Sequence, residues 1–373
     1  MTQSKISGGQ VVLLLYLSRM FTLLAAAPLS ERGEIGGGMA AAAALASFGF
    51  QLLLFYPGGK LMEQHGGQNF AQASAEVFGR AGKACALLFW LVLMVQAGLS
   101  AAEFEGFLLT AVYEDAPGGL FSLLFLAAAI FGAAVGLEAF ARFSVFGLTL
   151  FLFLLVSLFA GLLPDVRISE LFAAQVPSVP VFLRTAWSFA SGNLELLCFF
   201  LLLPQVRGER SSGKGLFYLW SGLHLLTGTA LLLLVTCVIG GSSDQGRLYP
   251  FYTLAMAAEG TLLARMDAVH MSVWSVLGLL RCCLLLYCAN IALRCALPVP
   301  LQEGMLRYVS QHREGVTAVG TLLAALAMGI PWVYEPVRFF WRGGGAVTVV
   351  LGVIPVAALF WEKLRKAKRR KDP

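Results

Sequence analysis

Charged residues are scarce in this chain. Asp, Glu, Lys and Arg make up 13% of its 373 residues, about half the share found in ordinary soluble domains. Hydrophobic residues make up 58%, and the mean hydropathy is +0.77. The length alone would allow two or three soluble domains, but these values exclude them. Apolar runs of about 20 residues, the length that crosses a bilayer as a helix, recur along the whole chain.

Metal-binding and disulfide patterns are also missing. The seven cysteines are an odd number, no CxxC pair occurs, and His270 is the only histidine near the main cysteine cluster. A zinc site needs closely spaced Cys and His ligands. The sequence therefore predicts no metal and no cofactor, and it predicts free thiols buried in apolar segments.

Complete nucleotide-binding and hydrolase motifs are also missing from the sequence. Residues 208–215 resemble a phosphate-binding loop, but Gly215 stands where a Ser or Thr hydroxyl would bind Mg²⁺. The histidines lie scattered outside any Ser/His/Asp context. We therefore expect no enzyme activity, and a short basic tail beside a membrane does not indicate nucleic-acid binding.

The apolar runs predict an all-α membrane protein with ten transmembrane helices. We expect a permease-like domain over residues 1–362 and a basic tail over 363–373. Pro and Gly residues, such as Pro57–Gly59, Pro117–Gly119 and Pro164, serve as breakers between runs. The predicted spans are 9–29, 36–56, 84–110, 118–136, 143–163, 182–204, 216–240, 268–296, 315–333 and 345–361.

Lys and Arg residues are unevenly divided between the two sides of these spans. Ten spans place both ends of the chain on one side, and that side receives most of the 27 Lys and Arg residues. Positively charged loops usually face the cytoplasm, so both termini are predicted to be cytoplasmic. The polar segment 57–83 is expected to carry a short surface helix on the same face. The segment 241–267 is the longest predicted connection on the other face.

Three ionisable residues lie near the middle of predicted spans: Arg19, Glu195 and Arg281. Each costs about 2.5–3.5 kcal/mol at the centre of a membrane helix unless it pairs or meets water. Glu195 could pair with either arginine, and such a pair could serve only to fix helix packing. The other possibility is that the second arginine is left to bind the carboxylate of a small ligand.

Small and polar residues interrupt the span that contains Glu195. Ser188, Ser191, Gly192 and Asn193 come just before it, and Gly is unfavourable inside a helix by about 1 kcal/mol relative to Ala. We predict an unwound turn here, because free backbone groups at this depth are tolerated where they line a cavity. The alternative is a continuous helix whose polar atoms bond to its own backbone.

The first span has polar residues at the corresponding depth, namely Ser18, Arg19 and Thr22. Paired interruptions in two halves of a chain are typical of inverted-repeat transporters. We therefore predict breaks in spans 1 and 6 of a 5+5 inverted repeat, with repeats of about 9–163 and 182–361.

The third span adds Gln96 near its centre. Glu103 and Glu105 follow nearer the outer surface, where they join Glu114 and Asp115. We interpret these four acidic residues as an outer rim solvated at the membrane interface.

Several short motifs occur along the chain. They are Ile6-Ser7-Gly8-Gly9-Gln10, Tyr56-Pro57, Glu76-Val77-Phe78-Gly79-Arg80-Ala81-Gly82-Lys83, Gly136-Leu137-Glu138-Ala139-Phe140-Ala141-Arg142, Tyr249-Pro250, and Ala264-Arg265-Met266-Asp267 with Trp274 and Arg281. Together they resemble motifs of the endospore germination permease family, the B subunits of spore germination receptors within the amino acid-polyamine-organocation superfamily. The resemblance covers essentially the whole chain.

The resemblance implies a LeuT-like fold in the inner membrane of a spore, among membrane lipids. It also implies a subunit that senses a small nutrient, commonly an amino acid, beside an A subunit and a lipoprotein C subunit. The family's ligand region maps to spans 1, 3, 6 and 8. There it implies roles for Thr22, Gln96, Ser191, Gly192, Asn193 and Arg281. Arg19 departs from the family pattern, in which an uncharged, glycine-containing break is expected.

The predicted function is nutrient sensing at mid-membrane. The alternatives are a secondary amino acid transporter coupled to H⁺ or Na⁺, in which Glu195 carries the proton, and a scaffold whose pocket binds nothing. The candidate ligand-binding residues are Arg19, Thr22, Gln96, Ser188, Ser191, Gly192, Asn193, Glu195 and Arg281.

Overall fold

The computed structural model describes residues 5–25, 35–113, 115, 117–172, 176–208, 213–240, 249–258, 266–297 and 312–371. Throughout these ranges the regular elements are helices, and the one β-type contact is an isolated bridge between Ile6 and Val206. Most of the predicted outer segment 241–267, and the end of the first predicted span, lie outside the described residues.

Nine helices precede residue 240 in the described part of the chain. They are α1 (Gly8–Ala25), α2 (Gly37–Gln64), α3 (Phe70–Phe78), α4 (Arg80–Ala111), α5 (Leu120–Val135), α6 (Leu137–Leu162), α7 (Val179–Ser191), α8 (Glu195–Leu202) and α9 (Lys214–Ile239). Short 3₁₀ turns follow α6 and α8.

The remaining helices begin after Tyr249. They are α10 (Pro250–Ala257), α11 (Met266–Ala296), α13 (Arg313–Met328), α14 (Pro331–Arg342), α15 (Gly345–Val347), a π-helical stretch (Thr348–Val353) and α16 (Ile354–Lys371).

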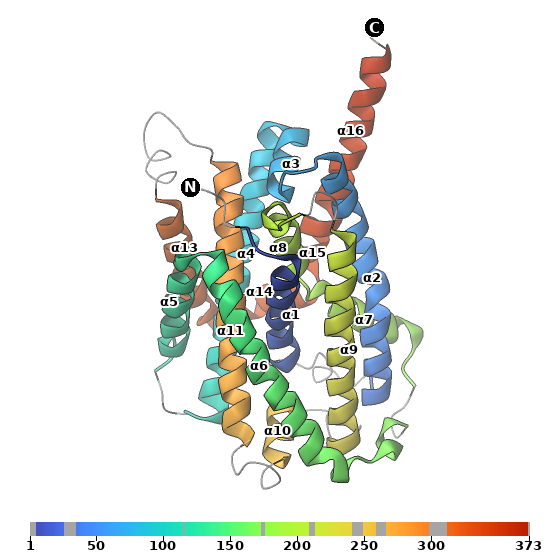
Figure 1. The fold of residues 1–373 in the computed structure, drawn as a ribbon, viewed down its shortest axis with the longest axis vertical. Coiled ribbons are helices and arrows are strands. Elements are labelled where there is room, and N and C mark those ends of the chain that lie inside the picture. The colour runs from blue at the N-terminus through green and yellow to red at the C-terminus, as the bar shows by residue number, and fades with distance from the viewer. Residues whose placement is uncertain are drawn as a thin grey trace.

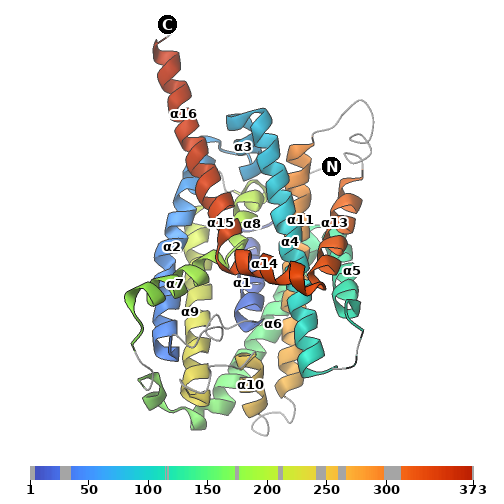
Figure 2. The same ribbon diagram turned by 180° about the vertical axis from the view of Figure 1, so that it is seen from behind.

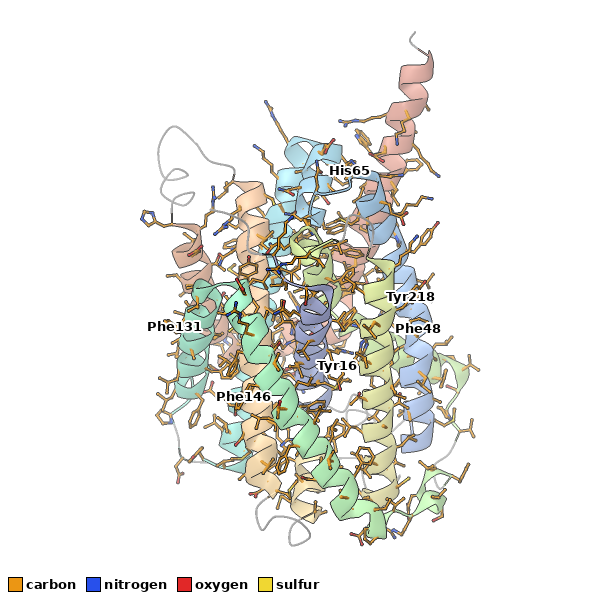
Figure 3. All side chains as sticks on the ribbon, viewed as in Figure 1. Tyr16, Phe48, His65, Phe131, Phe146 and Tyr218 are labelled. Carbon is orange, nitrogen blue, oxygen red and sulfur yellow. The ribbon has the colours of Figure 1, made fainter. Side chains whose placement is uncertain are left out.

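Among the described residues, seven helices or runs of joined helices are long and apolar enough to cross a membrane; α7–α8 and α15–α16 each count as one. An eighth candidate is the pair α13 and α14, which meet at 107°, while α1 and α5 are shorter apolar helices. Aromatic side chains on the periphery, such as Phe131 and Phe146, are 72% and 51% exposed and point outward (Figure 3). These features are those of a multi-pass membrane protein. The count of ten spans and the inverted-repeat relation stay predictions.

The core of the molecule surrounds α1. This helix packs against α4, α6, α8, α9 and α11 and lies in the middle of the bundle when the molecule is seen from the front or the back (Figures 1 and 2). Leu15, Leu17 and Phe21 are fully buried. A side chain on α1 therefore meets protein on every side.

The prediction of a break in the first span is wrong over the described residues. Helix α1 is continuous from Gly8 to Ala25. The polar residues are satisfied without unwinding, because Thr22 donates back to the Arg19 carbonyl at 2.9 Å and Ser18 donates to Glu195 at 2.9 Å. No Gly or Pro occurs between residues 10 and 25 to weaken the helix.

The predicted break in the sixth span is present. Helix α7 ends at Ser191, and α8 begins at Glu195. Gly192 and Asn193 form the turn between them, and their amides bond to the carbonyls of Ser188 and Ala190 at 3.1 and 3.2 Å. The carbonyls at the end of α7 are thereby available to side chains from other helices.

The prediction that Pro57–Gly59 ends the second span is also wrong. Helix α2 passes through Pro57 and continues to Gln64. Proline removes only one helical hydrogen bond, and Gly58 allows close packing on α8. A Cβ atom at Gly58 would come within 2.6 Å of the Phe200 ring.

The cytoplasm-facing elements predicted from charge lie together at one end of the bundle. The expected surface helix of segment 57–83 is α3, whose N-terminus is capped by Asn69. Helix α16 runs past it at the same end (Figure 1). His65 lies 3.3 Å from Glu362 on α16, and Glu63 pairs with Lys214 at 2.7 Å. Helix α16 reaches Lys371, so most of the predicted tail extends this helix.

Helix α14 lies across the body at about mid-height (Figure 2). Trp187 of α7 donates to the Gly343 carbonyl at 3.2 Å. Gly344 has a φ of +80°, and a Cβ atom there would lie 2.5 Å from the Cβ of Ser191. The turn after α14 is therefore seated on the end of α7, which brings α14 beside the break.

Candidate functional site

Glu195 pairs with Arg281. Arg281 Nη1 is hydrogen-bonded to Glu195 Oε1, and both side chains are fully buried. The Ser18 hydroxyl donates to the same carboxylate oxygen. The sequence left open whether Glu195 pairs with Arg19 or with Arg281. In the described residues it pairs with Arg281.

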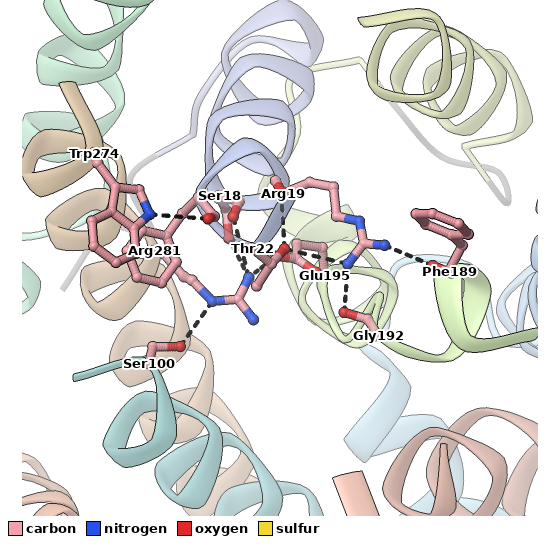
Figure 4. Close-up of polar contacts among 10 residues, drawn as sticks. Ser18, Arg19, Thr22, Ser100, Phe189, Gly192, Glu195, Trp274 and Arg281 are labelled. Atoms are coloured by element: carbon pink, nitrogen blue, oxygen red, sulfur yellow. Dashed lines mark hydrogen bonds and ion pairs between the residues drawn. The ribbon is translucent and has the colours of Figure 1, made fainter. Parts of the chain in front are cut away.

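Further contacts bind Arg281 into the helix packing (Figure 4). Its Nε donates to Ser100 Oγ at 3.0 Å, and its Nη1 donates to the Ser18 carbonyl at 3.2 Å. Through Glu195 the cluster joins α1, α4, α8 and α11. A buried pair of this kind specifies helix positions, because a charge left without its partner is very costly.

Arg19 makes a different set of contacts. Its Nη1 donates to the Gly192 carbonyl at 2.7 Å, and its Nη2 donates to the Phe189 carbonyl at 2.6 Å (Figure 4). A cation is favourable at a helix C-terminus, where carbonyl groups lack partners. Arg19 therefore caps α7 from the neighbouring helix. Among the described residues no carboxylate lies within ion-pair distance of it.

A cavity of about 150 Å³ opens beside Arg19. Six of the nine predicted site residues line it, and three do not: Asn193, Glu195 and Arg281. The lining residues are Arg19, Thr22, Leu23, Gln96, Leu99, Glu103, Ser188, Phe189, Ser191, Gly192, Leu194, Arg338, Trp341 and Val347.

The three residues outside the cavity lining are buried. Glu195 and Arg281 are paired with each other. Asn193 is 3% exposed, and its Oδ1 has no hydrogen-bond partner among the described residues. Whether any of the nine residues binds a ligand stays a prediction.

The interpretation of Glu103 and Glu105 as a solvated rim is wrong. Glu103 is only partly exposed and lines the cavity. Glu105 is 8% exposed and accepts a hydrogen bond from Ser122 at 2.6 Å. Asp115 is exposed, and Glu114 lies outside the described residues. Helical spacing could have revealed Glu103, because positions 96, 99 and 103 share one face of α4.

Arg338 and Trp341 complete the cavity from α14. The sequence carried no signal for them, because the segment 331–342 is far along the chain from the lining residues of α1, α4 and α7. Helix α14 reaches the site because the Gly343–Gly344 turn packs against the end of α7.

The cavity combines charges of both signs in a small space. Arg19 and Arg338 supply guanidinium groups, Glu103 supplies a carboxylate, and Ser188 and Ser191 supply hydroxyl groups. An apolar cavity of about 150 Å³ accepts a molecule the size of benzene. The geometry therefore suits a small ligand that carries both a carboxylate and a cationic group.

The model of the spore germination protein family matches residues 45–307 of the chain, which is more than half of its length. The chain belongs to the spore germination protein family. The matched region runs from α2 into the segment after α11 and includes the α7–α8 break and Arg281. No curated protein matches the chain. The family expected from the sequence motifs is confirmed, and the assignment to the B subunit stays a prediction.

Proposed function

We propose that this spore germination protein is a nutrient-sensing subunit that binds a small amino acid in the cavity beside Arg19. The observation that carries the proposal is the position of the Arg19 guanidinium and the acceptors it contacts. The guanidinium borders the cavity, and its direct acceptors are two neutral carbonyls and the Thr22 hydroxyl. A ligand carboxylate is a stronger acceptor than a carbonyl, because it adds the attraction between opposite charges and can accept two parallel N–H bonds from the planar guanidinium.

Glu103 supplies the matching anion for the ligand's ammonium group. It lies on α4, and Arg19 lies on α1, so the two charges border the cavity from different helices. Gln96 and Ser191 add polar groups that can orient the ligand. The cavity volume favours amino acids with about six non-hydrogen atoms, the size of benzene.

Binding then acts on the end of α7. A carboxylate on Arg19 competes with the carbonyls of Phe189 and Gly192 for the guanidinium. If Arg19 turns toward the ligand, the C-terminus of α7 loses its cap. A ligand shifts a conformational equilibrium only by its difference in affinity for the two states, and this exchange of acceptors supplies such a difference.

The family match supports a proposal about the setting of the protein. We propose that it lies in the inner membrane of the spore, with both termini in the cytoplasm, next to an A subunit and a lipoprotein C subunit. Two observations are consistent with this orientation: α3 and α16 share one end of the bundle, and Lys214 pairs with Glu63 of α2 shortly before α3 begins.

A second candidate function is ion-coupled transport of the same ligand. The observation that favours it is the interrupted α7–α8 span beside a cavity, an arrangement typical of secondary transporters. Glu103, which borders the cavity, would then carry the coupled proton. Glu195 is unsuited to that role because it is fully buried in its pair with Arg281.

A ligand screen tests the proposal. The purified protein is heated with each of the twenty amino acids, and a small amino acid is expected to raise the melting temperature. Arg19→Gln should abolish that shift. Arg142→Gln is the matched control, since Arg142 forms an exposed ion pair with Glu138 at 2.6 Å and should keep the shift.

Absence of any shift in the unsubstituted protein, or an equal shift in Arg19→Gln, would contradict the proposal. Uptake of the active amino acid into liposomes separates the two candidate functions. Accumulation that follows an ion gradient favours the transporter. Binding without uptake, with loss of germination on deletion of the protein, favours the sensor.

A further inference from the structure

A second and smaller space lies on the other side of Arg19. It measures about 10 Å³ and lies between α1, α2, α7 and α9. Four polar residues line it together with Arg19: Ser47, Gln51, His224 and Thr229. All of them are buried in the bundle. Arg19 thus borders the ligand cavity on one side and this space on the other.

The direction of each hydrogen bond at His224 can be worked out from its partners. The ring Nδ1 lies 2.9 Å from the Trp220 carbonyl, which can only accept, so Nδ1 carries the proton. In the neutral ring Nε2 is then an acceptor. The Gln51 Nε2, which lies 3.3 Å from it, donates the second bond.

These two bonds leave the amide oxygen of Gln51 as the group whose partner has to be found. Because the NH₂ group is committed to His224, the carbonyl Oε1 must find a donor elsewhere. It is buried and has no partner among the described residues. Arg19 Nε and Thr229 Oγ1 are likewise buried without a partner among the described residues. All three residues line the small space.

We propose that one ordered water molecule occupies this space and bridges Arg19, Gln51 and Thr229. A volume of about 10–15 Å³ holds one water. Water can accept from Arg19 Nε and donate to Gln51 Oε1, while the Thr229 hydroxyl can do either. A metal cation does not suit the site because Arg19 repels it, and an anion does not suit the Gln51 oxygen.

The bridge gives Arg19 a second attachment, to α2 and α9. The guanidinium is held by the carbonyls of α7 through Nη1 and Nη2 and by the water through Nε. A ligand that draws Arg19 into the cavity must therefore disturb the bridge as well as the cap. The signal then reaches the α2–α9 pair through Gln51 and His224. This consequence rests on the proposed function, whereas the water itself does not.

A high-resolution structure of the full-length protein without nutrient tests the water directly. We expect one density peak within hydrogen-bond distance of Arg19 Nε, Gln51 Oε1 and Thr229 Oγ1. A dry space, or a direct contact between Gln51 and Arg19 that closes it, would overturn the proposal. Thr229→Val, which keeps the shape and removes the hydroxyl, is expected to weaken or abolish the peak.

A double-mutant cycle on thermal stability tests the bridge without any ligand. Arg19→Lys keeps the charge and removes the Nε–H donor, and Gln51→Leu removes the acceptor. Because both changes break the same bridge, the double variant should lose less in melting temperature than the sum of the single losses. Additive losses would overturn the coupling. The matched control is Gln205→Leu, which removes a buried amide bonded to Tyr287 at 2.9 Å and should be additive with Arg19→Lys.

The two tests also separate this inference from the proposed function. Neither uses a nutrient, so a protein that binds no amino acid can still show the water and the coupling. A protein that binds an amino acid through Arg19 can likewise have a dry space and additive losses.

Discussion

Two arginines are buried near the centre of the bundle, and they do different things. Arg281 is fully buried and forms an ion pair with Glu195. Arg19 is 4% exposed, caps α7 through backbone carbonyls, and borders a cavity. The same side chain at similar depth is structural in one place and a candidate ligand contact in the other.

The difference comes from the available partners. Arg281 pairs with the Glu195 carboxylate and makes three hydrogen bonds to Ser18 and Ser100. Arg19 meets the broken end of α7, where Gly192 leaves room for its guanidinium. A buried arginine is therefore informative about function only when its counter-ion and its neighbouring space are known.

The largest effect is expected when the ion pair between Arg281 and Glu195 is broken. Arg281→Met leaves Glu195 buried without its partner and should destabilise the protein by about 3–5 kcal/mol. Thermal unfolding in detergent, followed by size-exclusion chromatography, measures the loss. The double variant Arg281→Met with Glu195→Gln should recover much of it, because the uncompensated charge is then gone. A single variant as stable as the parent would contradict the role assigned to this pair.

A smaller effect is expected at the ligand's cationic end. Glu103→Gln removes the carboxylate that borders the cavity, and hydrogen bonds to charged groups contribute about 1.5–3 kcal/mol. The affinity for the active amino acid should fall about 10- to 100-fold, as measured by calorimetry. Glu105→Gln is the control two residues away, since Glu105 bonds to Ser122 and does not line the cavity. Equal losses in both variants would remove the distinction between them.

The smallest effect concerns the space beside Arg19. A Cβ atom at Gly192 would lie 3.4 Å from Arg19 Nη1, which is ordinary contact, so a larger side chain must move the guanidinium. Gly192→Val should weaken binding about tenfold, equivalent to about 1.4 kcal/mol. Gly222 of α9 has no atom within 4 Å of its Cβ position, so Gly222→Val should leave affinity unchanged. Unchanged affinity in Gly192→Val would show that Arg19 is not a ligand contact.

Much of the architecture could be predicted because a bilayer restricts the choices. Each predicted span overlaps a described helix or run of helices, although α2 runs past Pro57 and α1 is not broken where expected. That all ten cross the membrane stays a prediction. Local composition predicted the α7–α8 break, since Gly192 weakens the helix and Asn193 competes for its backbone. The same reasoning failed at Thr22, whose hydroxyl bonds to its own helix.

The sequence by itself determined the class of protein, the apolar helices and the few charges that had to find partners inside them. It identified Arg19, Glu195 and Arg281 because ionisable residues in membrane spans are costly and therefore rare. Only the tertiary structure decided which arginine pairs with Glu195, and only the seat of α14 on α7 brought Arg338 and Trp341 to the cavity. The physical reason is that a charged residue inside an apolar run is visible in the sequence as a costly group that needs a partner, whereas the choice of partner depends on distances between helices that are remote in the chain.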